Sequence, residues 1–299
     1  MNRLTSLVCA AVVAVAAWPA VSLAQQAASG VSVEALRGPL HLLQGRGGNV
    51  VASVGFDGIL LIDDDYAELG PEYEKAIAGL TEFGLMPGFV VNTHWHADHT
   101  GNNEYWASRG AVILAHENVR VRMSTPQEIE ALDMQVEPSP RMALPMVTFE
   151  DSLALHFNGG DIEVQHYAAG HTDGDSVIYY VEDNVVHTGD LFFKDAYPFI
   201  DLSSGGSVDG YIASVEAVLS RVDDGTLIVP GHGDTANRED FERFLAMLKS
   251  TTEAVRTALD KGLSVEEIQQ LTLGAKWADW GEGFIDEKAW IATIAADHR

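Results

Sequence analysis

The segment Thr93-His94-Trp95-His96-Ala97-Asp98-His99-Thr100-Gly101 decides how this chain is interpreted. It follows the apolar run Phe89-Val90-Val91 and holds three histidines and an aspartate. In an extended or turning segment the first two histidines point the same way, and Asp98 and His99 come round toward the same space. A solvated polar loop has no need of these side chains together. Zinc prefers such nitrogen and oxygen ligands, so the segment predicts a metal site where a strand gives way to a helix.

Three single residues farther along the chain occupy the same kind of position, each beside a glycine in a loop that directly follows an apolar strand. They are His171 in Ala169-Gly170-His171-Thr172, Asp190 in His187-Thr188-Gly189-Asp190, and His232 in Val229-Pro230-Gly231-His232-Gly233. Each is a weak signal alone, because a lone histidine is usually a hydrogen-bonded structural residue and a Gly-Asp pair is usually a turn. Together with the histidine-rich segment they make seven candidate ligands.

This pattern resembles that of the metallo-β-lactamase superfamily, in which His-X-His-X-Asp-His is followed by His, Asp and His in that order. The resemblance extends from about Leu36 to Leu248. It implies an α/β fold, a four-layer αβ/βα sandwich, with two zinc ions at the edge of its sheets. It also implies two ligand sets bridged by Asp190: His94, His96 and His171 for one zinc, and Asp98, His99 and His232 for the other.

The chemistry expected of such a site is hydrolysis. Two metals that share a carboxylate, about 3.5–4 Å apart, leave room for a bridging hydroxide. Zinc lowers the pKa of bound water toward about 7, so hydroxide forms without a strong protein base. The predicted activity is the opening of a small amide, lactone or ester, and family analogy makes Asp98 a catalytic residue that orients the hydroxide and relays its proton.

The residue at the bridging position bears on the kind of hydrolase. The β-lactamases best known from resistance carry cysteine or serine there, whereas thioesterases of the glyoxalase II type and lactonases carry aspartate, like Asp190. A true β-lactamase and a thioesterase therefore remain alternatives. Lys194 is a second catalytic candidate as an anchor for a substrate carboxylate, although it lies one residue farther from the metal ligand than in β-lactamases. Its alternative interpretation is a surface lysine.

Two further alternatives concern the metal itself. A protein that binds metal without turnover is disfavoured because all seven ligands are present. Histidine and carboxylate ligands also accept iron. A redox role is disfavoured because we find no flavin-binding domain in the sequence, and glyoxalase II itself is disfavoured because its helical glutathione-binding domain has no room after His232.

The first residues predict export. Met1–Arg3 carries one positive charge, Leu4–Trp18 is almost wholly apolar, and Ser22-Leu23-Ala24 offers small residues before a cleavage site. An N-terminal membrane anchor is disfavoured because the apolar run is shorter than the roughly 20 residues of a span and ends at Pro19. We therefore expect a signal peptide over residues 1–24, a periplasmic or secreted protein, and no stable membrane anchor after cleavage.

The net charge and the cysteine content of the chain exclude some classes of partner and of metal site. The chain has 44 acidic residues against 18 basic ones, a formal net charge of -26, whereas binding to nucleic acid needs clustered cations. The only cysteine, Cys9, lies in the predicted leader, which excludes a disulfide framework and a cysteine zinc site from the mature chain. We expect a small-molecule substrate and no nucleic-acid partner, and the oligomeric state stays open.

The rest of the chain predicts one domain over residues 31–299, because no linker or repeat interrupts it. Ser124–Pro145, with four prolines, is expected to be a loop or a partly helical lid. Strands are predicted at Gly48–Val54, Gly58–Asp63, Phe89–Thr93, Ala111–Ala115, Met146–Glu150, Leu153–Phe157, Ile162–Tyr167, Val177–Val181, Val185–Thr188 and Thr226–Val229. Helices are predicted at Glu72–Phe83, Asn102–Arg109, Val208–Val222 and Arg238–Leu259.

Most aromatic residues and the remaining histidines are predicted to have structural roles, with one exception. Trp95 lies between two ligands and is expected in the core. The exception is the loop after Asp190, whose aromatic residues are predicted to line the substrate site: Phe192, Phe193, Tyr197 and Phe199. A C-terminal helical cap is expected to pack on the core through Trp277, Trp280, Phe284 and Trp290. The structural histidines are His41, His116, His156, His166, His187 and His298.

Overall fold

The computed structural model describes residues 30–81 and 84–298, and the predicted signal peptide lies outside them. Its larger sheet has seven strands in the order β1-β2-β3-β4-β5-β6-β9. The strands as far as β4 pair as antiparallel hairpins, and those from β4 to β9 pair in parallel. Their bounds are β1 Ser32–Ala35, β2 Leu40–Gln44, β3 Val50–Gly55, β4 Gly58–Ile62, β5 Phe89–Val91, β6 Val112–His116 and β9 Val147–Phe149.

The second sheet has five strands in the order β10-β11-β12-β13-β14. All its pairs are antiparallel except β13 with β14, which run in parallel. The bounds are β10 Ser152–Phe157, β11 Gly160–His166, β12 Ser176–Tyr180, β13 Val185–His187 and β14 Leu227–Val229. A separate hairpin joins β7 (Gln127–Ile129) to β8 (Met134–Val136).

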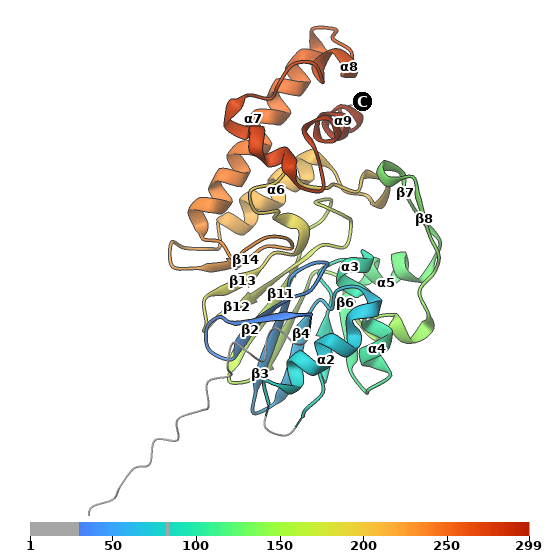
Figure 1. Cartoon of the computed structure of the whole chain (residues 1–299), viewed down its shortest axis with the longest axis vertical. Coiled ribbons are helices and arrows are strands. Elements are labelled where there is room, and N and C mark those ends of the chain that lie inside the picture. The colour runs from blue at the N-terminus through green and yellow to red at the C-terminus, as the bar shows by residue number, and fades with distance from the viewer. Residues whose placement is uncertain (1–29, 82–83, 299) are drawn as a thin grey trace, which may run out of the picture.

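Helices cover the outer faces of both sheets. The α-helices are α2 Gly70–Ala78, α3 Ala97–Thr100, α4 Asn103–Ala107, α5 Glu117–Ser124, α6 Val208–Leu219, α7 Arg238–Asp260, α8 Val265–Ile268 and α9 Glu287–Asp297. Short 3-10 helices are Ala67–Leu69, Glu130–Leu132, Arg141–Ala143, Gly189–Leu191, Leu202–Ser204 and Ala275–Glu282. Figure 1 shows α6, α7 and α9 together beyond β13 and β14, and α2 and α4 on the opposite side of the molecule.

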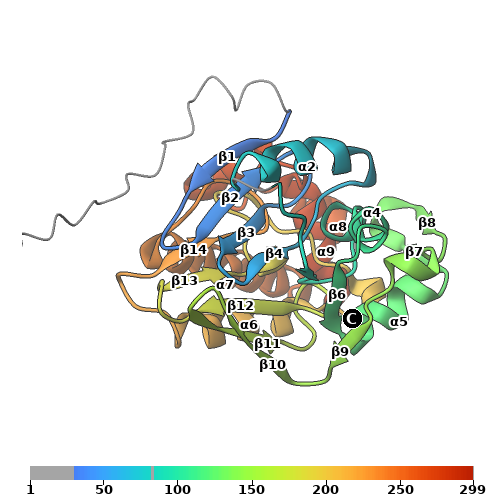
Figure 2. The same ribbon diagram turned by 90° about the horizontal axis from the view of Figure 1, so that it is seen from below.

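Strands with apolar residues at successive positions explain the four layers, because such strands are buried on both faces. In β4, Leu60 and Ile62 pack between the two sheets, whereas Ile59 and Leu61 pack outward against α2. Figure 2 shows β2, β3 and β4 between α2 and the strands of the second sheet. The outer face of the second sheet forms the largest core with α6, α7 and α9. The predicted αβ/βα sandwich is confirmed.

Most predicted elements are present with shifted ends, and the differences have local causes. The helix predicted over Glu72–Phe83 ends at Ala78, because the glycine that closes it is Gly79, whose N–H bonds to the Ala76 carbonyl. Ser124–Pro145 contains the β7–β8 hairpin, whose three-residue strands are too short to produce a period in the sequence. Within the described ranges, no helix is both long and apolar enough to cross a membrane.

Candidate metal centre

The seven predicted ligands meet because the segments that carry them leave their strands at one edge of the sandwich. His94 and His96 lie between β5 and α3, and α3 carries Asp98 and His99. The second sheet supplies the other three, which follow β11, β13 and β14: His171, Asp190 and His232. Since β13 and β14 are parallel, their carboxyl ends lie side by side, and the loops that follow them meet.

Asp190 lies at the centre of the cluster. Its Oδ2 atom is 3.5 Å from both His171 Nε2 and His232 Nε2, and its Oδ1 atom is 3.1 Å from His99 Nε2. Three triads of candidate donor atoms, each within 4.8 Å of one another, make up the site: His94, His96 and His171; His94, His99 and Asp190; and Asp98, His99 and His232. The structure thus brings all seven residues together, and the triad that contains Asp190 includes one histidine from each predicted set, His94 and His99.

Outer hydrogen bonds orient the imidazole rings. His99 Nδ1 donates to Asp63 Oδ2 over 2.7 Å, and His171 Nδ1 donates to the Phe199 carbonyl over 2.8 Å. His94 Nδ1 lies 3.0 Å from Thr93 Oγ1, and His96 Nε2 lies 3.2 Å from Asp201 Oδ2. A histidine that binds metal commonly donates its other ring N–H in this way, which fixes the tautomer and the ring orientation.

The atoms left facing inward fit a metal. Among the described residues, His94 Nε2, His99 Nε2 and Asp190 Oδ1 are buried side-chain atoms without a hydrogen-bond partner. Burying such groups unpaired is costly, and metal coordination would satisfy them. The inward donors are imidazole nitrogens and carboxylate oxygens, the set that zinc accepts.

Burial and charge set the protonation of the cluster. Burial lowers the pKa of His94 well below its ordinary value and lowers that of His171 to about 4. Burial also opposes charge on His232, but Asp190 and Asp98 outweigh it and raise the pKa of His232 to about 9. Burial raises the pKa of Asp98 by itself, yet the charges of His99 and His232 hold it at about 2. Asp98 is therefore ionised at neutral pH in the protein without metal.

At Gly48 and Gly231 the backbone passes so close to a candidate ligand that there is no room for a side chain. A Cβ atom on Gly231 would lie 2.0 Å from Asp190 Oδ1, and one on Gly48 would lie 2.1 Å from the His99 ring. Both distances are far inside van der Waals contact, so any side chain at either position would displace a ligand. The β2–β3 loop, which carries Gly48, therefore packs directly against the site, a contact that the sequence did not indicate.

Sequence reasoning missed the carboxylates that support the ligands. Asp63 accepts hydrogen bonds from Thr93 N, Thr93 Oγ1 and His99 Nδ1. It follows the apolar run of β4, the same position after a strand that singled out the ligands, so a signal for Asp63 existed. Asp201 has no comparable signal, because the sequence gives no reason to pair it with His96, 105 residues away.

The aromatic residues after Asp190 divide between the site and the core. Phe193 stacks on the His232 ring at 5.2 Å, and Phe199 lies 5.8 Å from the His96 ring and 5.7 Å from the His171 ring. The prediction that all four line the substrate site is wrong for Phe192 and Tyr197, whose rings pack on core residues. Phe192 packs on Phe241 and Phe244, and Tyr197 packs on Trp290.

The structure also places Trp95, the aromatic residues of the C-terminal segment and Lys194. Trp95 is buried in the core, as predicted, and so are Trp277, Trp280 and Trp290 of the C-terminal segment. The prediction of a buried position is wrong for Phe284, which is 71% exposed. Lys194 lies beside the site, because its backbone N–H donates to the His232 carbonyl. Its Nζ donates to the Thr235 carbonyl over 2.8 Å and lies 3.8 Å from Asp240 Oδ2.

Asp98 and His232 are the most exposed of the seven candidate ligands. The Asp98 and His232 side chains are 19% and 31% exposed, whereas His94, His99 and His171 are buried.

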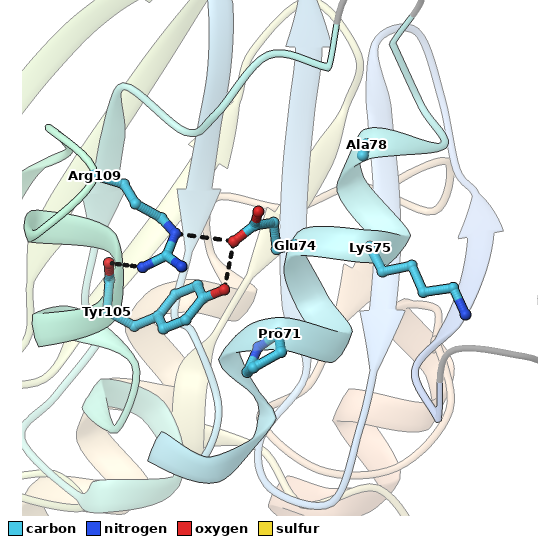
Figure 3. Close-up of a pocket in the computed structure, with 6 residues that line it drawn as sticks. All are labelled: Pro71, Glu74, Lys75, Ala78, Tyr105 and Arg109. Atoms are coloured by element: carbon cyan, nitrogen blue, oxygen red, sulfur yellow. Dashed lines mark hydrogen bonds and ion pairs between the residues drawn. The ribbon is translucent and has the colours of Figure 1, made fainter.

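A surface hollow of about 420 Å³ between α2 and α4 is a different feature, since none of the seven ligands lines it. There Glu74 is bound by Tyr105 and Arg109, as Figure 3 shows, and this ion pair joins the two helices.

The chain matches a known protein family over most of the region that carries the candidate ligands. A family model described as the metallo-beta-lactamase superfamily matches residues 71–232, more than half of the chain. The chain belongs to the metallo-beta-lactamase superfamily. It is therefore a member of a metallo-hydrolase superfamily whose His and Asp side chains form groups able to hold metal ions.

Relatives within the superfamily carry different names. The chain is 25% identical over 208 residues to "Probable metallo-hydrolase YqgX" of Bacillus subtilis, covering 65% of this chain and 94% of that protein. It is 25% identical to "Hydroxyacylglutathione hydrolase GloC" of Haemophilus influenzae, covering 55% and 77% of the two chains. It is also 25% identical to "Metallo-beta-lactamase type 2" of Bacillus cereus, covering 64% and 69%.

Solved structures share the fold at low identity. A metallo-beta-lactamase from Pontibacter korlensis superposes with a TM-score of 0.61 at 18% identity, covering 73% of this chain and 99% of that one. A double mutant of the sec-alkyl sulfatase PisA1 superposes with a TM-score of 0.68 at 15% identity, covering 88% and 49%. At these identities the similarity shows the fold of this superfamily member and leaves its substrate open.

Proposed function

We propose that this protein is an exported dinuclear zinc hydrolase that opens a small amide, lactone or ester. The observation that carries the proposal is the convergence of two candidate ligand sets on Asp190, with buried donor atoms that have no hydrogen-bond partner within the described parts of the chain. Aspartate at this bridging position favours ester, lactone and thioester hydrolysis over the chemistry of the cysteine- and serine-containing β-lactamases. The name of the relative GloC is in line with this class of reaction.

In this proposal each residue has a defined part. His94, His96 and His171 would hold one zinc, Asp98, His99 and His232 would hold the other, and Asp190 would lie between the two sets. Zinc bound there supplies Lewis acidity and lowers the pKa of bound water toward about 7. Asp98, which is partly exposed, would orient the attacking water and accept its proton. Asp63 and Asp201 hold the rings of His99 and His96 in place.

The test compares substrate classes on zinc-loaded protein. We expect one among an aryl ester, a lactone, a thioester and a chromogenic cephalosporin to be hydrolysed with kcat/KM above about 10⁴ M⁻¹s⁻¹. A chelator should abolish this turnover and added zinc should restore it. Asp98→Asn, assayed at saturating zinc, should lose at least about 100-fold in kcat. Asp224→Asn, a change at an exposed carboxylate, is the matched control. Unchanged turnover in Asp98→Asn would rule out its role.

A second candidate is β-lactam hydrolysis, favoured by the position of Lys194 beside His232. Preference for the cephalosporin over the esters would make it the leading function. Zinc binding at both sites without turnover of any substrate class would instead favour a protein that binds metal without catalysis.

Export is tested separately. The proposed cleavage after Ala24 predicts a periplasmic or secreted protein whose N-terminal residue is Gln25. Fractionation of the producing cell and the intact mass of the recovered protein check this. A full-length chain that stays with the membrane fraction would refute export by a cleaved signal.

A further inference from the structure

Phe284 is a large apolar side chain left in solvent next to the metal centre. It is 71% exposed, although the next residue, Ile285, is buried. Its ring lies edge-on against Phe199, with the centroids 6.1 Å apart and the planes at 83°. Phe199 in turn contacts the rings of His96 and His171. An exposed aromatic ring therefore stands one side chain away from two metal ligands.

The backbone on both sides of Phe284 is fixed. Tyr197 N donates to the Trp280 carbonyl over 3.1 Å, which ties the preceding segment to the loop after Asp190. A Cβ atom on Gly283 would lie 3.3 Å from the Ala196 Cβ, so the two segments touch just before Phe284. After it, Asp286 caps α9 by accepting a hydrogen bond from Ala289 N over 2.8 Å. The ring is thus held in place without being buried.

The position of Phe199 is also fixed, because its backbone is hydrogen-bonded to one of the candidate ligands. Its carbonyl accepts the hydrogen bond from His171 Nδ1, and its side chain is buried. The ring of Phe199 therefore keeps its position relative to the metal-facing atom of His171. We call Phe199 and Phe284 the Phe199–Phe284 wall. It runs from the rings of His96 and His171, which Phe199 contacts, to the exposed ring of Phe284.

We propose that the Phe199–Phe284 wall binds an alkyl or aryl group of the substrate. The inference rests on the proposed hydrolase function and narrows it to esters, lactones or amides that carry an apolar group beside the reacting carbonyl. Burying one methylene contributes about 0.8 kcal/mol, which is roughly fourfold in affinity. A rigid ring makes such contacts without first losing the conformational freedom of a flexible side chain.

The test measures binding rather than turnover, so that it does not depend on the substrate. Acetohydroxamate and octanohydroxamate share a metal-binding head and differ in the length of the alkyl chain. We expect calorimetry on the zinc-loaded protein to show octanohydroxamate binding at least about tenfold more tightly than acetohydroxamate. Phe284→Ala should reduce this preference to within about threefold and leave the affinity for acetohydroxamate unchanged. Phe284→Tyr, which keeps the ring, should retain the preference.

A second exposed phenylalanine, far along the chain from Phe284, provides the control. Phe56 is fully exposed in the turn between β3 and β4, so Phe56→Ala removes an exposed phenylalanine elsewhere and should change neither affinity. Equal or undetectable binding of the two hydroxamates to the native protein overturns the proposal, and so does a preference that survives Phe284→Ala. A preference that depends on Phe284, in a protein that hydrolyses no ester, lactone or amide, would support the wall and refute the hydrolase function.

Discussion

At the scale of single residues, the metal centre depends on side chains that do not face the metal. Asp63 lies behind His99, Asp201 behind His96, and the Phe199 carbonyl behind His171. Each of these acceptors selects which ring nitrogen is left for the metal. The identity of the ligands is therefore only part of the site, and substitutions in the supporting residues test the remainder.

Asp63→Asn should weaken zinc binding by about 10–100-fold, because an amide cannot accept all the hydrogen bonds that hold His99 and Thr93. Competition with a chromogenic chelator measures the affinity. Asp224→Asn removes a carboxylate that is exposed to solvent and should bind zinc like the native protein. Native affinity in Asp63→Asn would mean that the hydrogen bond to His99 has no part in metal binding.

Lys194→Ala separates two roles for this side chain. If Lys194 binds a substrate carboxylate, KM for a cephalosporin should rise about tenfold while KM for an uncharged ester stays unchanged, because one charge-assisted contact is lost. Steady-state kinetics on both substrates provides the measurement. Unchanged KM values together with a lower urea midpoint would assign Lys194 to its contact with the Thr235 carbonyl alone.

At the scale of elements, short loops after strand ends place the ligands, and helices at the C-terminus hold one of those loops. The strands flanking the site were predicted because apolar runs followed by glycine and polar residues are local signals. The β7–β8 hairpin and α5 were not predicted, because short or weakly amphipathic segments give no clear period. The packing of α9 on the loop after Asp190 is a contact between distant segments that no local pattern encodes.

Trp290→Ala should lower the free energy of unfolding by about 3–5 kcal/mol, because it opens a cavity where α9 packs on Tyr197. It also removes the hydrogen bond from Trp290 Nε1 to Thr251 Oγ1. Urea unfolding gives the measurement, with Leu271→Ala at an exposed position as the control. A loss below about 1 kcal/mol would show that α9 is not part of the cooperative core.

At the scale of the whole molecule, the two sheets meet at a pair of stacked histidines that are not among the seven candidate ligands. His116 ends β6 of the first sheet and His166 ends β11 of the second, and their rings lie 3.7 Å apart at 14°. His116 Nε2 donates to the Glu150 carbonyl, and His166 Nδ1 donates to the Asp175 carbonyl. Burial lowers the pKa of both rings, and the charge of His116 further lowers that of His166.

This pair predicts a loss of stability in mild acid. Both rings are disfavoured as cations in the folded protein, whereas in the unfolded chain they bind protons near the ordinary pKa of 6.5. Their contribution to stability is therefore complete above that pKa and is lost as the pH falls from it through the lowered folded values. The urea midpoint of the native protein should decrease between about pH 7 and pH 5.

His166→Asn isolates the contribution of the pair, since the amide can still donate to the Asp175 carbonyl. The decrease of the urea midpoint over the same pH interval should be smaller than in the native protein. His156→Asn removes a histidine that is exposed on β10 and should leave the decrease unchanged. Equal decreases in all three proteins would show that the stacked pair does not sense pH.

The sequence by itself determined the seven candidate ligands, their order and the α/β layering. Apolar runs, turn residues and a ligand motif act over a few neighbouring residues, so they can be identified without knowledge of contacts. Only the tertiary structure decided that Asp201 supports His96, that Gly48 packs on His99 and that Phe284 stands exposed beside Phe199. Each of these contacts joins residues far apart in the chain, and packing, which depends on the whole fold, brings them together.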